Sequence, residues 1–74
     1  MYMPSRETVE YLRRKFPVGC KVELVRMDDI AAPPVGTIGE VTGVDDAGSV
    51  MVIWSNGSSL SIILGVDICH RIDE

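Results

Sequence analysis

The sequence has little of several features on which other protein classes depend. Two cysteines among 74 residues fall short of the disulfide framework of a small secreted domain. The apolar runs are far shorter than the roughly 20 residues of a membrane span, and none precedes a small-residue cleavage site. We therefore expect a cytoplasmic protein with reduced thiols and no membrane partner.

Residue types that carry catalysis or bind metals are also scarce. His70 is the single histidine, and the acidic pairs at 28–29 and 45–46 fall in loop and turn sequences. Cys69 and His70 are neighbours in a predicted strand and point to opposite faces, so they are poorly placed to share one ion. We predict no catalytic residue, no metal site and no cofactor.

The chain is short but apolar enough to fold. Hydrophobic residues make up 46% of the sequence, and there is no low-complexity tract or internal repeat. A chain of this size forms one domain and buries only about 60% of its unfolded surface. Its stability therefore depends on how completely its few elements cover one another.

The formal net charge of −4 is unevenly distributed along the chain. Residues 1–27 carry six basic and three acidic side chains, whereas residues 28–74 carry one basic and eight acidic ones. An acidic body argues against a broad duplex nucleic-acid footprint. The candidate anion contacts are Arg13, Arg14, Lys15 and Arg71. The first three also suit the C-terminal end of a helix, where the dipole favours cations.

Residues 5–15 are predicted to form an amphipathic helix. Ser5 is a suitable N-cap, Val9, Leu12 and Phe16 follow at helical spacing, and Pro17 ends the segment. A helix this short is not stable alone, so its apolar stripe must dock on another part of the chain. We assign residues 1–18 to a helical segment that packs on a barrel, and residues 19–74 to the barrel.

Five segments with a two-residue apolar period follow the helix. The predicted strands are residues 20–27, 37–44, 49–54, 58–64 and 68–72. Residues 28–36 predict a long loop stiffened by prolines, residues 45–48 a turn, and Asn56-Gly57 a type I′ hairpin. Gly39 and Gly43 indicate a close backbone approach or a bulge. This order predicts a mainly β fold: an SH3-like, five-stranded small barrel preceded by one N-terminal amphipathic α-helix. An OB-like or other small barrel is the competing topology.

A resemblance to known families supports this fold. Residues 35–57 read VGxxGxVxxVDxxGxVxVxWxNG, which resembles the strand-turn pattern of KOW-type modules and Mib/Herc2-type interaction domains. Nearly the whole chain resembles an uncharacterised domain-of-unknown-function family of small proteins from bacteria, phages and conjugative elements. The resemblance implies an SH3-like fold and a mobile-element setting. It supplies no assigned active site.

The strand around residues 49–54 has apolar side chains on both faces. Val50, Val52 and Trp54 share one face with Leu60, Ile62 and Leu64 of the next strand, and we assign this face to the core. Met51, Ile53 and Ile63 then form an apolar patch outside the hairpin. Either the N-terminal helix covers this patch, which we favour, or a second copy of the protein does.

The tryptophan and the two cysteines carry further expectations. Trp54 is expected to pack in the core, with the alternative that its indole N–H is free for a partner at the barrel rim. A Cys20–Cys69 disulfide needs the first and last strands to be adjacent, which a barrel allows, but it is opposed if Ile68 and Ile72 face inward, because Cys69 then faces outward while Cys20 faces inward.

These observations predict a non-catalytic binding module, an accessory protein of a phage or other mobile element that acts by protein–protein interaction. The candidate interaction surface is Met51, Ile53, Ile63 and Trp54. One alternative is an oligomeric phage counter-defence protein that captures a small anionic, nucleotide-type ligand between subunits. Another is a nucleic-acid-binding KOW-like module, which the acidic loops disfavour.

Overall fold

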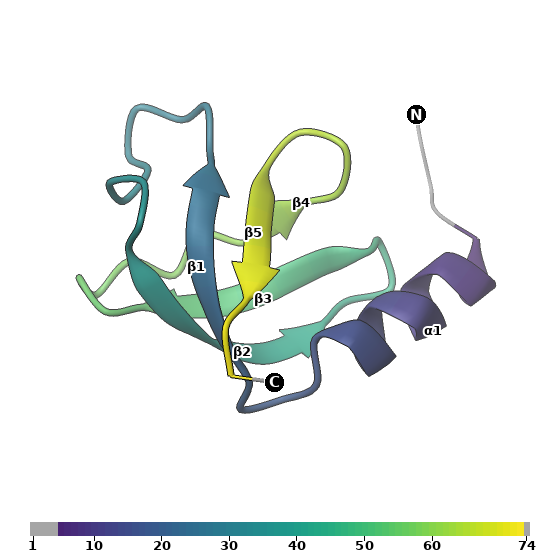
Figure 1. The fold of residues 1–74 in the computed structure, drawn as a ribbon. Coiled ribbons are helices and arrows are strands. Elements are labelled where there is room, and N and C mark those ends of the chain that lie inside the picture. Colours follow the sequence, from purple (N-terminus) through teal and green to yellow (C-terminus); the bar gives the residue numbers. More distant parts are fainter. Residues whose placement is uncertain (1–4, 74) are drawn as a thin grey trace.

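The computed structural model describes residues 5–73, and within them one helix precedes five strands (Figure 1). The elements are α1 (Arg6–Lys15), β1 (Lys21–Arg26), β2 (Ile38–Val44), β3 (Ser49–Trp54), β4 (Ile62–Ile63) and β5 (Ile68–Arg71). The predicted helix and the predicted strand at 49–54 are confirmed to within one residue. The bounds of β1, β2 and β5 lie within one residue of the predicted ones at each end.

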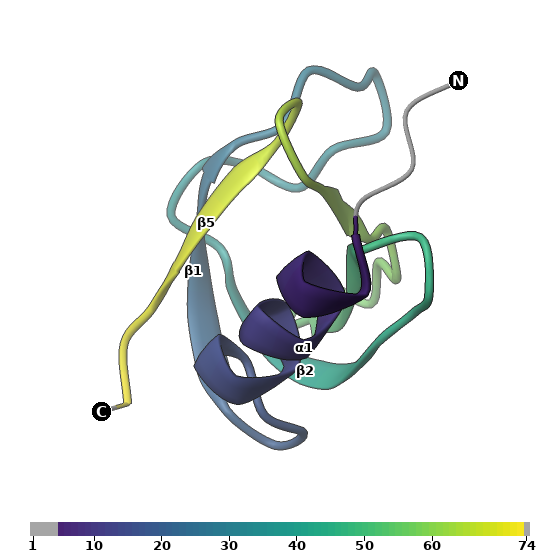
Figure 2. The same ribbon diagram turned by 90° about the vertical axis from the view of Figure 1, so that its right-hand side faces the viewer.

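All five strands belong to one antiparallel sheet in the order β4-β3-β2-β1-β5. The first four strands pair in succession, and β5 returns to pair with β1. The two edge strands, β4 and β5, also contact each other, so the sheet curls into a small barrel-like fold with α1 beside it (Figure 2). The predicted fold class, mainly β with an N-terminal helix, is confirmed.

Helix α1 covers the concave side of the sheet and not its outer face. Ser5 caps the helix by accepting a hydrogen bond from the N–H of Thr8. The buried stripe of Val9, Leu12 and Phe16 belongs to the same hydrophobic cluster as the inward side chains of the strands. The expectation that this helix covers the outer hairpin patch is wrong, because its stripe completes the core instead.

The centre of the core is built around Trp54 of β3. This side chain is only 1% exposed, and Val22, Leu24, Val41 and Val52 beside it are equally buried. Gly39 of β2 lies directly opposite Trp54 in the sheet. A Cβ atom at Gly39 would lie 2.7 Å from Cε3 of the indole, so the absence of a side chain here lets the ring pack on the backbone. Gly43 lies at the register shift between β2 and β3. The close approach and the bulge predicted from these two glycines are both confirmed.

The two hairpin turns share one geometry, which differs from the predicted type I′ form. Asn56 does not have a positive φ, whereas Gly57 has a φ of 91°. The N–H of Gly57 donates to the carbonyl of Trp54, and the N–H of Trp54 donates to the carbonyl of Ser58. This is a three-residue loop in which a left-handed glycine follows the turn. Gly48, with a φ of 80°, ends the predicted turn at residues 45–48 in the same way.

Strand β4 is much shorter than the predicted strand at residues 58–64. The indole N–H of Trp54 donates to the carbonyl of Leu60 at 2.8 Å, in a segment that runs outside the sheet. At the other end, the carbonyl of Ile63 accepts from the N–H groups of Val66 and Asp67, so a turn begins there. Leu64 is consequently 39% exposed, and its assignment to the core is wrong.

Strand β5 presents the opposite face to that expected. Cys69 lies opposite Leu24, a fully buried residue of β1, and paired residues of an antiparallel sheet share a face. Cys69 is therefore directed inward, and Ile68 and Ile72 are exposed. The predicted orientation is wrong, yet both cysteines remain thiols. Cys20 lies outside the β1–β5 pairing, four residues before Leu24 in the chain.

Candidate functional site

The outer face of the sheet carries a shallow groove across β1, β2 and β3. Its volume is about 420 Å³, and its lining residues are Lys21, Ile38, Gly39, Glu40, Thr42, Ile53, Trp54 and Ser55. We call this the outer groove. Ile53 and Ile38 form its apolar part and are 51% and 38% exposed, respectively. The described part of the chain leaves this apolar surface open to solvent.

Strand register explains why these side chains gather. Lys21 lies opposite Glu40, and Glu40 lies opposite Ile53, so the three form one row across three strands. Lys21 Nζ and Glu40 Oε1 form an ion pair within the groove. In the next row Glu23 lies opposite Ile38, and its carboxylate pairs with His70 Nε2 at 2.9 Å. Lys21 and Glu40 therefore balance each other on this face, the Glu23 carboxylate is partnered by the His70 ring, and the isoleucines lie beside these pairs.

The predicted patch of Met51, Ile53 and Ile63 is divided in the structure. Ile63 lies opposite Ser49, four residues along β3 from Ile53, which places it about 13 Å away at the strand rise. Met51 is half-buried, with its terminal methyl beside Gly43. Ile53 belongs to the outer groove, and Ile63 belongs to the surface around the β4–β5 turn.

Trp54 borders the outer groove but does not offer its indole to a partner. Its side chain is buried, and its N–H is engaged by the carbonyl of Leu60. Ile38 and Glu40 were missing from the predicted surface. Their alternation with buried Gly39 and Val41 was a usable signal, because it places residues 38 and 40 on the same outward face.

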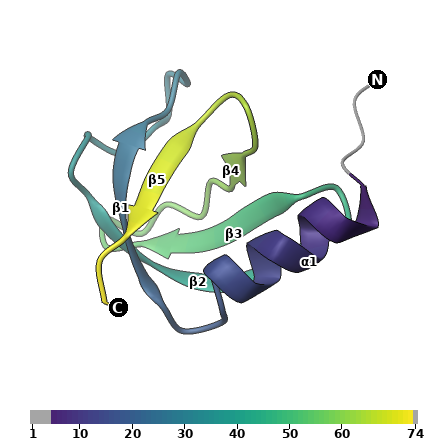
Figure 3. The same ribbon diagram turned by 45° about the vertical axis from the view of Figure 1, so that its right-hand side comes forward.

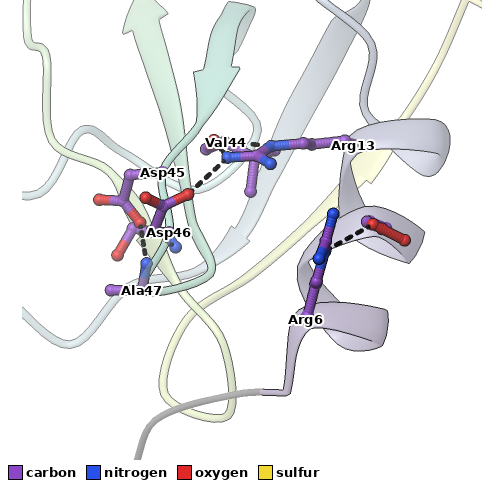
Figure 4. A network of polar contacts seen from close by, with 8 residues as sticks. Arg6, Arg13, Val44, Asp45, Asp46 and Ala47 are labelled. Carbon is purple, nitrogen blue, oxygen red and sulfur yellow. Dashed lines mark hydrogen bonds and ion pairs between the residues drawn. The ribbon is translucent and has the colours of Figure 1, made fainter.

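Arg13, a candidate anion contact, joins the helix to the β2–β3 turn (Figure 4). Its Nε and Nη2 atoms donate to the carbonyl of Val44 at 3.1 and 2.9 Å, and Nη2 also pairs with Asp46 at 3.0 Å. Asp45 shapes the same turn by accepting from the N–H groups of Ala47 and Ser49. Arg13 therefore fixes the orientation of α1 on the sheet.

The other predicted anion contacts have separate surroundings. Lys15 lies over the rings of Tyr11 and Phe16, at 5.9 and 5.5 Å from their centroids. Arg14 is exposed next to it. Arg71 pairs with Asp73 at 2.9 Å, and this bond is the main reason that the pKa of Asp73 is lowered from 3.8. Capture of an anion by Arg13 and Arg71 requires rearrangement of these pairs, and this hypothesis stays a prediction.

The described residues lack two further features. Among residues 5–73, no group of three or more His, Cys, Asp or Glu side chains is arranged to hold a metal ion. In the same part of the chain, no helix has the length and apolar character needed to cross a membrane. The thiol of Cys69 is partly buried on the inner side of β5. Burial is the main cause that raises its pKa to about 11, with a smaller contribution from Cys20.

Together, the fold and the outer groove define a small barrel-like β module with an N-terminal helix and an exposed apolar sheet face. Residues 5–72 match the family described as domain of unknown function (DUF4314), and the chain belongs to that family. The match covers α1 and all five strands. No curated protein matches the sequence. No solved structure matches it either.

Proposed function

We propose that this protein is a non-catalytic binding module that engages another protein through the outer groove. The observation that carries the proposal is the exposure of Ile53 and Ile38 in neighbouring rows of a groove on a three-stranded surface. Solvent-exposed aliphatic side chains that gather in a groove mark contact surfaces more often than isolated ones do. The groove is built from paired strands, so a partner would bind without ordering a flexible loop.

The charges in the groove favour a protein partner over a nucleic acid. Lys21 and Glu40 balance each other within it, and the acidic loops add no cation. A phosphate backbone requires an excess of basic groups on the contact face. A partner segment with aliphatic side chains would bury Ile53 and Ile38, and Thr42 and Ser55 at the margins offer hydroxyl groups to its backbone.

The biological setting of the proposal is a mobile element. The resemblance to small proteins of phages and conjugative elements supports an accessory protein that acts by occupying a host or element protein in the cytoplasm. Such a mechanism needs a preformed surface and no catalytic group.

The proposal is tested by capturing partners with purified variants from extracts of the native host. Ile53→Ser removes the exposed apolar group from the groove, and Ile53→Thr keeps the β-branch in case the serine variant unfolds. Val18→Ser is the matched control, because Val18 is exposed between α1 and β1 and does not line the outer groove. Fluorescence of the buried Trp54 reports whether each variant is folded.

We expect the wild type and Val18→Ser to retain the same partner at near-stoichiometric amounts. The Ile53 variants should lose it while they remain folded. Equal retention by all folded variants would refute the assignment of the outer groove.

A further inference from the structure

The charges of the outer groove have a fixed order, and this order indicates the kind of partner that fits it. The row across the three strands runs from Lys21 on β1 through Glu40 on β2 to Ile53 on β3. The paired side chains of Lys21 and Glu40 are 48% and 52% exposed, and Ile53 is 51% exposed. The row therefore presents a cation, an anion and an aliphatic group, in that order, to a partner.

Both charged groups retain capacity for a second partner. Their contact joins one ammonium group to one carboxylate oxygen, whereas an ammonium carries three N–H donors and a carboxylate has two acceptor oxygens. Among residues 5–73, neither group forms a second ion pair. An acidic group beside Lys21 and a basic group beside Glu40 would complete a square of alternating charges. The reverse order would bring like charges together and be rejected.

Ile38 and Ile53 define where an aliphatic side chain of the partner binds. Ile38 lies two residues before Glu40 on the same outward face, and Glu40 lies opposite Ile53. The two isoleucines are therefore diagonal neighbours, about 7–8 Å apart. The Gly39–Trp54 pair lies between their rows and lines the groove. An aliphatic side chain placed over this pair contacts both isoleucines.

The groove lies on the face of the sheet and not at an edge. It forms where β1 pairs with the first residues of β2, before the two strands diverge (Figure 3). Within a sheet, the backbone N–H and carbonyl groups are directed at the neighbouring strands. An extended partner segment would leave its own backbone groups without partners here, whereas a helix satisfies them internally.

The spacing of the row also favours a helix. Neighbouring strands lie about 4.8 Å apart, so the row from Lys21 to Ile53 spans about 10 Å. Residues i, i+3 and i+7 share one face of a helix, at about 0, 4.5 and 10.5 Å along its axis. Residues on one face of an extended segment are about 6.7 Å apart, and the third of them would miss the end of the row by about 3 Å.

We propose that the partner presents an α-helix that lies across β1, β2 and β3 in the outer groove, an inference that rests on the function proposed above. This helix carries an acidic residue at position i beside Lys21, a basic residue at i+3 beside Glu40, and an aliphatic residue at i+7 between Ile38 and Ile53. Its direction follows from its own stability, because an acidic residue N-terminal to a basic one complements the helix dipole.

The test uses synthetic peptides and the full chain. The matching peptide is alanine-based, with glutamate, lysine and leucine at i, i+3 and i+7, and about 18 residues long so that it is helical alone. The exchanged peptide has the glutamate and the lysine interchanged, and a third peptide carries a proline within the motif to break the helix. Fluorescence anisotropy of the labelled peptides at low salt gives the dissociation constants.

The critical variant exchanges the two charges of the protein. Lys21→Glu combined with Glu40→Lys keeps an intrachain ion pair but reverses the order of the charges. The wild type should bind the matching peptide about fivefold more tightly than the exchanged peptide, and the double variant should show the opposite preference. Ile53→Ser should weaken binding of the matching peptide about tenfold, whereas Val18→Ser, outside the groove, should leave it unchanged.

Three results would overturn the inference: no binding of the matching peptide, the same peptide preference in the wild type and the folded double variant, or equal binding of the proline peptide. The fluorescence of Trp54 reports folding of each variant. If any of these results accompanies capture of a host partner that depends on Ile53, the helix is excluded and the function proposed above stands. Capture that is independent of Ile53 removes both.

Discussion

The packing of Trp54 on Gly39 predicts a large effect of one methyl group. In Gly39→Ala, the new Cβ would lie 2.4 Å from Cγ1 of Val52 and 2.7 Å from Cε3 of Trp54. Both neighbours are buried at the centre of the core and cannot move aside freely. Overpacking of a well-packed core costs about 1–3 kcal/mol, and contacts this short place the substitution at the upper end.

The net effect is somewhat smaller than the packing cost. Alanine lowers the entropy of the unfolded chain and returns about 0.4–1 kcal/mol. We therefore expect the free energy of unfolding to fall by about 2 kcal/mol. For a domain of this size, that corresponds to a decrease in Tm of about 8–16 °C.

Urea unfolding followed by the fluorescence of the single tryptophan measures this change directly. Gly43→Ala is the matched control, since its Cβ would meet only the flexible end of Met51, at 3.0 Å. The control should lose much less stability. A Gly39→Ala variant as stable as the wild type, or a Gly43→Ala variant equally destabilised, would refute this account of the core.

Three further predictions concern polar groups. Arg13→Ala should lower the free energy of unfolding by about 1–2 kcal/mol, because a charged donor to a backbone carbonyl is lost, whereas Arg14→Ala should change it by less than about 0.5 kcal/mol in the same urea assay. The pKa of Asp73 in the folded protein is lowered from its ordinary value of 3.8. Its carboxylate therefore stabilises the folded state at pH values above 3.8, and this contribution is lost as the pH falls through the lower pKa of the folded protein. Asp73→Asn should therefore be less stable than the wild type near neutral pH, and acid titration of both proteins should show the difference closing below pH 3.8. With its pKa raised from 9.0 to about 11, native Cys69 should react with iodoacetamide at pH 8 about a hundredfold more slowly than in urea, as peptide mass mapping would show; equal rates would contradict its burial.

The elements that the sequence predicted well are those governed by local pattern. The helix follows from its Ser5 cap, its spacing of buried residues and Pro17, and β3 follows from alternation between two turns. The elements predicted poorly depend on tertiary contacts. Strand β4 is short because the residues before it run outside the sheet, where the carbonyl of Leu60 accepts a hydrogen bond from the indole N–H of Trp54. No local sequence pattern predicts this hydrogen bond, because it depends on how the Trp54 ring packs over Gly39.

The candidate site shows the same division. Alternation placed Ile53 outside the barrel correctly, but the register between β3 and β4 separated Ile63 from it. Register is a pairwise property of two strands, and a single sequence gives little information about it when both faces are apolar. The sequence also does not decide which face of the sheet α1 packs against, because the apolar stripe of the helix would fit either the core or the outer face.

The most direct measurement of the central claim is photocrosslinking inside the native host. A photoreactive amino acid replaces Ile53 in the outer groove, and the same amino acid replaces Val18 in a control protein. We predict a discrete crosslinked protein partner from position 53 and none from position 18. The same products from both positions, or none from position 53 in a folded protein, would contradict the proposal that the outer groove is the working surface.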